Sequence, residues 1–275
     1  MGAFFETIPK SLIQWILDQR VFWVSTVPLS GAGHVNVSPK GGAYFGVVND
    51  TTFWYMDLSG SGNETISHLY EPGNGRITVL FNAFEGPPRI LRLFGHGRVL
   101  ENATREFNDF IETHNVTTIP GSRSIVVVDI HQVGTSCGYS VPFYDFKEFR
   151  PTLNEFFEKK AKKFAEGNDK ESITRFWALN NAWSVDGLPG MQVGVKIMKE
   201  QGIESSKKMK GPHVMTNYSR PRDGFTVEQL LLAAVLGALM AVVFILYGLQ
   251  IAHLMRTGLV GDAQRAKWRV PTMSH

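Results

Sequence analysis

The stretch HVNVSPKGGAYFGVVNDTTFWYMDLSGSGNETISHL, residues 34–69, contains three strand-like runs separated by short turns. The runs are HVNVS (34–38), AYFGVV (43–48) and TTFWYMDL (51–58). They are rich in aromatic and β-branched residues, and Gly, Asn or Asp stands between them. Such close spacing predicts an antiparallel sheet or barrel rather than alternating β-α-β units.

Strand-like runs continue on both sides of this stretch until about residue 135, and helices are predicted to dominate after it. Further strands are expected at 21–27, 76–81, 89–100 and 124–133, which makes about seven in all. Helices are expected at 11–19, 64–70, 104–114, 153–165 and 171–180, the first with Ser11 as its N-cap. The pattern predicts one α+β domain over residues 1–195.

Lys40 stands where the first run changes character. Residues 34–38 alternate polar and apolar, as in a half-buried strand, and Ser-Pro-Lys-Gly-Gly is expected to end that strand. The lysine is therefore predicted in a turn at the mouth of the sheet. Two interpretations remain open from these residues: a solvated turn lysine, or a cation that faces a ligand.

The segment LSGSGNETISHL, 58–69, leads from a strand through a glycine-rich loop into a helix. Ser61 and Glu64 fit a capping box that only starts the helix. Gly60 and Gly62 also allow backbone N–H groups to face a phosphate, although the charge of Glu64 would compete there. A Rossmann motif is disfavoured, because Thr65 occupies the position of its third glycine.

Other motifs and the composition argue against several functions. GTSCG, 134–138, matches the G-x-S-x-G nucleophile elbow, but no helix is predicted after it, so a hydrolase is disfavoured and Cys137 is expected to be a small buried thiol. The histidines lack metal-ligand spacing, which predicts no metal site. A net charge of only +3 gives no indication of a nucleic-acid partner.

The segment Leu230 to Leu249 runs for 20 residues without a charge. As a helix it spans about 30 Å, the thickness of the hydrocarbon core of a bilayer. We expect a membrane-spanning helix at 225–255, a basic flexible tether before it at 196–224 and a short polar tail after it at 256–275. The segment MGAFFETIPK does not resemble a signal peptide. These features predict a single-pass, tail-anchored membrane protein whose main domain faces the cytosol.

Six sequence blocks, in order along residues 5–190, carry a resemblance to a known family. They are VSPKG (37–41), SGSGNETISHL (59–69), GRITVLF (75–81), EGPPRILRLFGHGRV (85–99), TSCGYSVP (135–142) and SVDGLPG (184–190). Together they resemble the pyridoxamine 5'-phosphate oxidase-like proteins, in particular a branch found in bacteria and fungi. The resemblance implies an FMN-binding split barrel: a six-stranded antiparallel Greek-key barrel with flanking helices, assembled as a homodimer with FMN at the subunit interface.

The resemblance also implies which residues hold the cofactor. Ser38 and Lys40 would contact the isoalloxazine ring or the phosphate, Tyr55 and Asp57 the ring and ribityl chain, and Asn63 and Thr65 the phosphate. Arg89 and Arg92 are further candidates, with Arg92 preferred; since they are three residues apart on a strand, they cannot face one ligand together. The oxidase itself has a Ser-Arg-Lys phosphate clamp where this chain has Asn63, Glu64 and Thr65.

The function implied is that of an FMN-dependent oxidoreductase that transfers hydride through flavin N5 on a small organic substrate which the sequence does not identify. The oxidase's C-terminal substrate signature is not recognisable here, so pyridoxamine phosphate is not carried over as substrate, and no catalytic residue is assigned. The alternative is a non-catalytic split-barrel module that binds flavin or haem and is tethered to a membrane.

Overall fold

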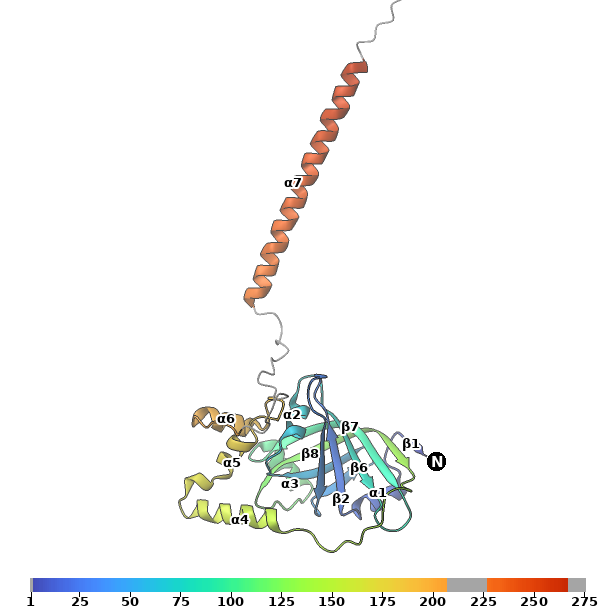
Figure 1. Ribbon diagram of the computed structural model, residues 1–275, viewed down its shortest axis with the longest axis vertical. Coiled ribbons are helices and arrows are strands. Elements are labelled where there is room, and N and C mark those ends of the chain that lie inside the picture. The colour runs from blue at the N-terminus through green and yellow to red at the C-terminus, as the bar shows by residue number, and fades with distance from the viewer. Residues whose placement is uncertain (1, 207–226, 267–275) are drawn as a thin grey trace, which may run out of the picture. The chain divides into compact units, whose positions relative to one another are not determined.

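The computed structural model describes residues 2–206 and 227–266, which belong to two separate units (Figure 1). The first is an α+β domain built on a curled antiparallel sheet, as predicted. The second is the long helix α7 (Val227–Ala266).

The sheet of the first unit contains eight strands, all paired antiparallel, in the order β3-β2-β6-β7-β8-β5-β4, with β1 beside β8. They are β1 (Ala3–Phe5), β2 (Val21–Thr26), β3 (Asn36–Gly41), β4 (Phe45–Asn49), β5 (Thr52–Leu58), β6 (Arg76–Asn82), β7 (Ile90–Glu101) and β8 (Ser122–Ser136). The seven predicted strands are all present. The eighth, β1, was missed because its three residues are too few to show a period.

Aromatic side chains show that the sheet curls round to enclose its core. β2 and β4 are five positions apart in the strand order, yet the rings of Phe22 and Phe45 lie 5.1 Å apart between centroids. Phe22 also contacts Phe53 on β5 and Phe81 on β6, at 5.6 and 5.4 Å. Edge-on and tilted contacts of this kind stabilise a core beyond the burial of its apolar area. The sheet is therefore a half-barrel around an aromatic centre.

The edge strand β3 corrects the prediction that the strand ends at Ser38. It runs through the proline to Gly41 and pairs with β2 so that Lys40 lies opposite Phe22. Pro39 is tolerated because β3 is at the edge of the sheet, where one row of N–H groups has no strand to bond. Since side chains alternate along a strand, Lys40 faces the barrel, whereas Val37 is exposed on the other side.

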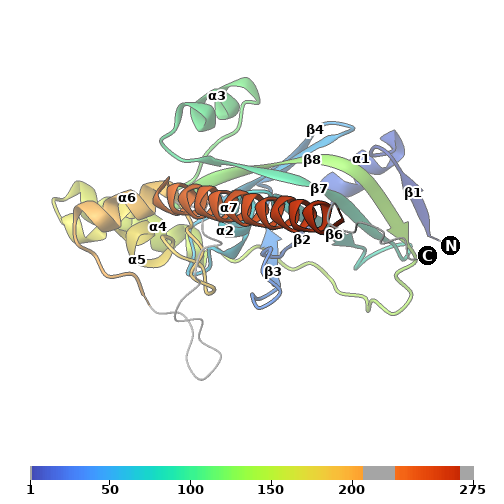
Figure 2. The ribbon, with the colours of Figure 1, turned by 90° about the horizontal axis from the view of Figure 1, so that it is seen from above.

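Seven α-helices and a short 3-10 helix occupy the described residues. They are α1 (Lys10–Leu17), α2 (Glu64–Tyr70), α3 (Arg105–Thr113), α4 (Thr152–Ala165), η1 (Asp169–Glu171), α5 (Ile173–Asn180), α6 (Gln192–Glu200) and α7. Figures 1 and 2 show α4, α5 and α6 grouped at one end of the sheet, with β1 and α1 at the other. The two predicted N-caps are wrong: Pro9 rather than Ser11 precedes α1, and Asn63 rather than Ser61 precedes α2.

Helix α6 was not predicted, and it occupies residues 196–200 of the segment expected to be a tether. Its first turn is held by a distant acid, since the carboxylate of Glu101 accepts hydrogen bonds from the backbone N–H groups of Gln192 and Val193, at 2.6 and 3.0 Å. A carboxylate at a helix N-terminus satisfies donors that have no partner within the helix. Of the remaining tether, 207–224 lies outside the described residues.

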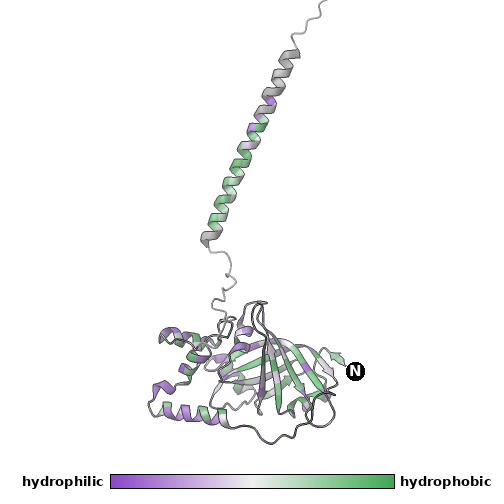
Figure 3. Cartoon of the chain, in the orientation of Figure 1, coloured by the Kyte–Doolittle hydropathy of each residue, from purple (hydrophilic) through white to green (hydrophobic). Residues whose placement is uncertain are grey.

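Helix α7 is long and apolar enough to cross a membrane over Leu231–His253, where the mean hydropathy is 2.5 (Figure 3). The helix continues beyond the predicted span, which ends at 255, as far as Ala266. The first part of the predicted polar tail is therefore helical, and residues 267–275 of that tail lie outside the described part of the chain.

Candidate functional site

A buried row of charges connects the edge strand β3 with the opposite side of the barrel. Lys40 Nζ on β3 lies 2.6 Å from Asp57 Oδ1 on β5, and Arg123 on β8 donates to Asp57 Oδ2 at 2.8 Å. Asp57 is fully buried, and Arg123 also donates to the carbonyl of Gly62 at 2.6 Å. Because β3 and β5 are not neighbours in the sheet, the ion pair between Lys40 and Asp57 joins the two sides where strand pairing does not.

The electrostatics of Asp57 follow from its two cations. Burial alone would raise the pKa of the Asp57 carboxyl, but the charges of Arg123 and Lys40 and their hydrogen bonds outweigh it and hold that pKa below the ordinary value of 3.8. Asp57 is therefore ionised under physiological conditions, and both of its oxygens are engaged.

This lowered pKa predicts a loss of stability in acid. Because the folded-state pKa lies below the unfolded one, the contribution is complete above pH 3.8 and is lost as the pH falls from there through the lower folded value. As the pH is lowered through this window, we expect the free energy of unfolding to decrease more steeply for the native chain than for Asp57→Asn. Urea denaturation at a series of pH values measures both slopes; parallel curves would contradict the assignment.

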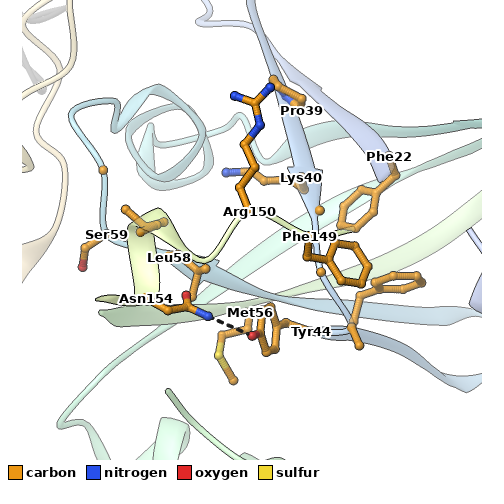
Figure 4. A pocket seen from close by; sticks show the side chains of 16 residues that line it. Phe22, Pro39, Lys40, Tyr44, Met56, Leu58, Ser59, Phe149, Arg150 and Asn154 are labelled. Atoms are coloured by element: carbon orange, nitrogen blue, oxygen red, sulfur yellow. Dashed lines mark hydrogen bonds between the residues drawn. The ribbon is translucent and has the colours of Figure 1, made fainter. Parts of the chain in front are cut away.

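Beside this ionic row lies a cavity of about 440 Å³, which we call the edge cavity. Its walls come from β2, the end of β3, the turn into β4 and the start of β4, and from β5 and the loop after it: Phe22, Pro39, Lys40, Gly41, Gly42, Ala43, Tyr44, Phe45, Met56, Leu58, Ser59 and Gly60. Its volume is in the range of small-molecule sites, which combine apolar walls with a few polar groups. Figure 4 shows the rings of Phe22 and Phe149 on one side and the nitrogen tips of Lys40 and Arg150 on the other.

The rest of the edge cavity is formed by a segment that no motif marked. Phe149 and Arg150 belong to the irregular β8–α4 loop, residues 137–151, and Leu153 and Asn154 begin α4. Asn154 Nδ2 donates to the hydroxyl of Tyr44 at 3.3 Å, which ties α4 to the turn before β4 (Figure 4). Arg150 has no hydrogen-bond or ion-pair partner among the described residues. The cavity therefore has a second cation besides Lys40.

Two of the other predicted residues lie close to the ionic row. Tyr55 is buried, its ring centroid is 5.7 Å from Lys40 Nζ, and its hydroxyl has no partner within the described chain. Burial, followed by the charge of Asp57, raises the pKa of the Tyr55 hydroxyl well above its ordinary value, so it stays a neutral donor. Ser38, which shares the barrel-facing side of β3 with Lys40, donates to Asn36 Oδ1 at 3.0 Å.

Asn63 and Thr65 are buried and do not line the edge cavity. Asn63 Nδ2 donates to Ser67 at 3.1 Å, and Thr65 accepts from Asn36 Nδ2 at 2.9 Å. The loop at 184–190 packs against them so closely that a side chain at Gly190 would collide with the Asn63 amide. Of the loop between β5 and α2, residues 59–63, only Ser59 and Gly60 line the edge cavity.

The carboxylate of Glu64 occupies the start of α2, where a phosphate was considered. Its Oε2 accepts from the backbone N–H of Asn63 at 2.9 Å and its Oε1 from that of Val185 at 3.2 Å. Glu64 thus competes with a phosphate as expected, because its carboxylate oxygens already accept from these two N–H groups.

Arg89, just before β7, and Arg92 on β7 are directed elsewhere. Arg92 donates to Ser136 Oγ at 3.3 Å, and Arg89 lies over the ring of Trp15 at 5.2 Å. Neither lines the edge cavity. Among the described residues, the cations of this cavity are instead Lys40 and Arg150, with Arg123 behind Asp57.

The motifs that were disfavoured give no competing site. β8 ends at Ser136, in the middle of the GTSCG motif, and is followed by the irregular loop, not by the helix that a nucleophile elbow needs. Cys137 is exposed, so the expectation of a buried thiol is wrong. Within the described residues no group of His, Cys, Asp or Glu side chains is arranged to hold a metal ion.

The curled antiparallel sheet, its flanking helices and a largely apolar cavity with two cations at its edge define a split-barrel protein. No family model matches the chain. However, it is 37% identical over 204 residues to the pyridoxamine 5'-phosphate oxidase family protein ustO of Aspergillus flavus, an alignment that covers 71% of this chain and 80% of that protein. The chain belongs to the pyridoxamine 5'-phosphate oxidase family.

Solved structures with similar backbones have lower identity. HupZ of Group A Streptococcus (TM-score 0.36, 15% identity) aligns with 47% of this chain and 99% of its own. A putative pyridoxamine 5'-phosphate oxidase of Lactobacillus delbrueckii has a TM-score of 0.35 and 14% identity, over 47% of this chain and 94% of its own. An FAD-binding protein of Mycobacterium smegmatis has a TM-score of 0.34 and 13% identity, over 47% of this chain and 96% of its own. The family assignment is based on the Aspergillus relative.

Proposed function

We propose that this chain is a flavin-dependent oxidoreductase that binds FMN in the edge cavity and is anchored to a membrane by α7. The observation that carries the proposal is the cavity itself: a space of about 440 Å³ at the edge of a split barrel of this family, lined by aromatic rings and two cations. FMN combines a planar aromatic ring with a phosphate, and these walls match both parts chemically.

The residues present fit this cofactor at its charged end. Lys40 has three N–H donors and gives one to Asp57, so donors remain for a phosphate or for the ring. Arg150 supplies a guanidinium, which suits phosphate oxygens, and the backbone at Ser59 and Gly60 completes this side of the cavity. Tyr55 lies behind Lys40 and does not line the edge cavity, so its buried hydroxyl is not assigned to the cofactor.

The chemistry of the proposed enzyme is divided between cofactor and protein. When bound, a flavin accepts hydride at N5. The chain itself would hold the cofactor's charge with Lys40 and Arg150, keep Lys40 in place through Asp57 and Arg123, and limit access of water through the rings of Phe22 and Phe149. Such a site needs no separate acid–base pair, and none is assigned.

A homodimer is part of this proposal. Val37 on the outer face of β3 and Val35 just before that strand are exposed, with 61% and 67% of their surface accessible, whereas the polar side chains of β3 face inward. An exposed edge strand with an apolar face is suited to association with a second chain. Light scattering of the purified protein tests it, and a monomer would contradict it.

A second candidate, a non-catalytic module that binds flavin or haem, is favoured by Glu64. Its carboxylate takes backbone donors at the start of α2 that could otherwise bind a phosphate. The two functions differ in turnover. We expect the FMN-loaded full chain to lose the absorbance of oxidised flavin when NADPH or NADH is added without oxygen, and to regain it with an acceptor. Bound flavin that no donor reduces would support the module instead.

The membrane anchor gives a separate prediction. Leu231–His253 contains no residue that is buried within the structure, as expected for a helix that lipid surrounds. We expect the full chain to stay in the membrane pellet after alkaline carbonate extraction, and a chain that ends at residue 206 to be released. The main domain is proposed to face the cytosol, so protease added to intact vesicles should digest it. Recovery of the full chain in the soluble fraction would contradict the anchor.

A further inference from the structure

A second and larger cavity, of about 1010 Å³, lies under the β8–α4 loop, and we call it the loop cavity. It is enclosed by the end of α1 and the start of β2, the end of β3, the β6–β7 turn and the loop itself: Trp15, Asp18, Gln19, Arg20, Val21, Pro39, Gly41, Phe84, Glu85, Gly86, Pro87 and residues 144–150. Most of the residues around this space do not line the edge cavity.

The loop cavity shares a wall with the edge cavity. Pro39, Gly41, Phe149 and Arg150 line both. A molecule in the loop cavity would therefore lie next to whatever fills the edge cavity, separated from it by the end of β3 and by the side chains of Phe149 and Arg150.

Aromatic rings from three separate elements line the loop cavity. They are Trp15 at α1, Phe84 in the β6–β7 turn, and Tyr144, Phe146 and Phe149 in the β8–α4 loop. Tyr144 packs edge-on against Phe84 at 5.2 Å, and Phe146 packs on Phe149 at 4.8 Å. The three rings of the loop are nevertheless partly exposed. Rings that are held by their neighbours but keep free surface are suited to contact another planar ring.

Most charges around the loop cavity already have a partner. Arg20 lies over the ring of Phe146 at 5.5 Å, Glu85 accepts weakly from the backbone N–H of Phe146 at 3.4 Å, and Lys147 is 3.7 Å from Glu148. Asp18 accepts from Gln14 at 2.9 Å. Asp145 and Arg150 are the lining charges that lack such a partner among the described residues, and Arg150 is the one that stands where the two cavities meet.

The geometry points to the loop cavity as a binding site for the substrate, which we assign to the class of small aromatic carboxylic acids. The ring would lie between the aromatic side chains of the loop, α1 and the β6–β7 turn. The carboxylate would accept from the N–H groups of Arg150 that face the loop cavity, since a guanidinium has five N–H donors and can contact FMN across the boundary as well. This inference extends the proposed function, because the oxidation of such a molecule rests on a flavin in the edge cavity. Binding of the aromatic acid in the loop cavity does not require a flavin.

Three probes of similar size separate the contributions of ring and charge. Indole-3-acetate has both features, cyclohexylacetate keeps the carboxylate without an aromatic ring, and tryptamine keeps the ring with a positive charge. We expect calorimetric titration of the full chain in detergent, without added flavin, to show one indole-3-acetate per chain, bound at least tenfold more tightly than the other two. Equal or tighter binding of cyclohexylacetate or tryptamine would overturn the assigned class.

Variants locate the site and have a matched control. Phe146→Ala removes a ring from the cavity and should weaken indole-3-acetate binding about tenfold, and Arg150→Gln should weaken it by a similar factor while leaving the affinity for neutral indole unchanged. Tyr139→Ala removes an aromatic side chain that is 81% exposed in the same loop and lines neither cavity, so binding should not change. Equal effects of Phe146→Ala and Tyr139→Ala would overturn the location.

Two further measurements separate substrate binding in the loop cavity from cofactor binding and from dimer formation. If the chain takes up FMN but binds no indole-3-acetate, the substrate site is wrong and the proposed function stands. If it binds indole-3-acetate but no flavin, the proposed function is wrong and the binding site in the loop cavity stands. If Phe146→Ala, unlike Tyr139→Ala, converts a dimer to a monomer, a second copy of the chain covers the loop cavity, which also overturns the inference.

Discussion

Replacing Asp57 by alanine is expected to lower the free energy of unfolding by about 3–5 kcal/mol, the usual cost of removing one partner from a buried ion pair. The side chain of Arg123 is only 4% exposed, and Asp57 is its acidic partner. In the variant the guanidinium would remain buried without a counter-charge, and Lys40 would lose the group that holds it across the barrel. Urea denaturation of the full chain in mild detergent, followed by tryptophan fluorescence, measures the change.

The sheet offers a matched control in a second aspartate–arginine pair. Arg98 Nε lies 3.0 Å from Asp129 Oδ2, but the two side chains are 59% and 53% exposed. Because exposed ion pairs contribute little, Asp129→Ala should change the free energy of unfolding by less than about 1 kcal/mol. If Asp57→Ala and Asp129→Ala lower the free energy of unfolding by the same amount, the ion pairs of Asp57 with Lys40 and Arg123 do not hold the barrel closed.

Replacing Lys40 by methionine is expected to weaken FMN binding by about tenfold to a hundredfold. A hydrogen bond to a charged group contributes about 1.5–3 kcal/mol, and each 1.4 kcal/mol corresponds to a factor of ten. Methionine keeps much of the side-chain length but removes the charge. The fold should suffer less than in Asp57→Ala, because Asp57 keeps its bonds to Arg123. Quenching of FMN fluorescence on titration with the protein gives both affinities.

Arg92→Met is the control for this second prediction. It removes one positive charge from the same sheet, and Arg92 contacts Ser136 rather than the edge cavity. Its affinity for FMN should equal that of the native chain. A loss as large as that of Lys40→Met would mean that the cofactor lies along β7, as the resemblance first suggested for Arg92, and not at the edge of the barrel.

Much of the fold could be predicted because its information is local. The runs at 43–48 and 51–58 have strand composition and short turns, and they form β4 and β5. Helix α2 was predicted from its loop and begins at the expected Glu64. β3 was predicted to be too short, because whether a strand tolerates Pro39 depends on its place at the sheet edge, which is a property of the tertiary structure.

The candidate site was less predictable, because it depends on contacts between distant segments. The pairing of Asp57 with Arg123 joins residues 66 positions apart, and no local pattern marks it. Arg150 lies in a loop without a motif and reaches the cavity only through the path of that loop. The family resemblance implies that Asn63 contacts the phosphate, and no local pattern shows that the segment at 184–190 packs over it.

Uptake of FMN by the purified full chain is the most direct test of whether the edge cavity binds this cofactor. The protein would be incubated with FMN in detergent, separated from free cofactor by gel filtration, and its absorbance spectrum recorded. We expect the visible absorption of a bound flavin at one equivalent per chain, and much less of it for Lys40→Met. A colourless native protein, after incubation with either FMN or FAD, would contradict the account.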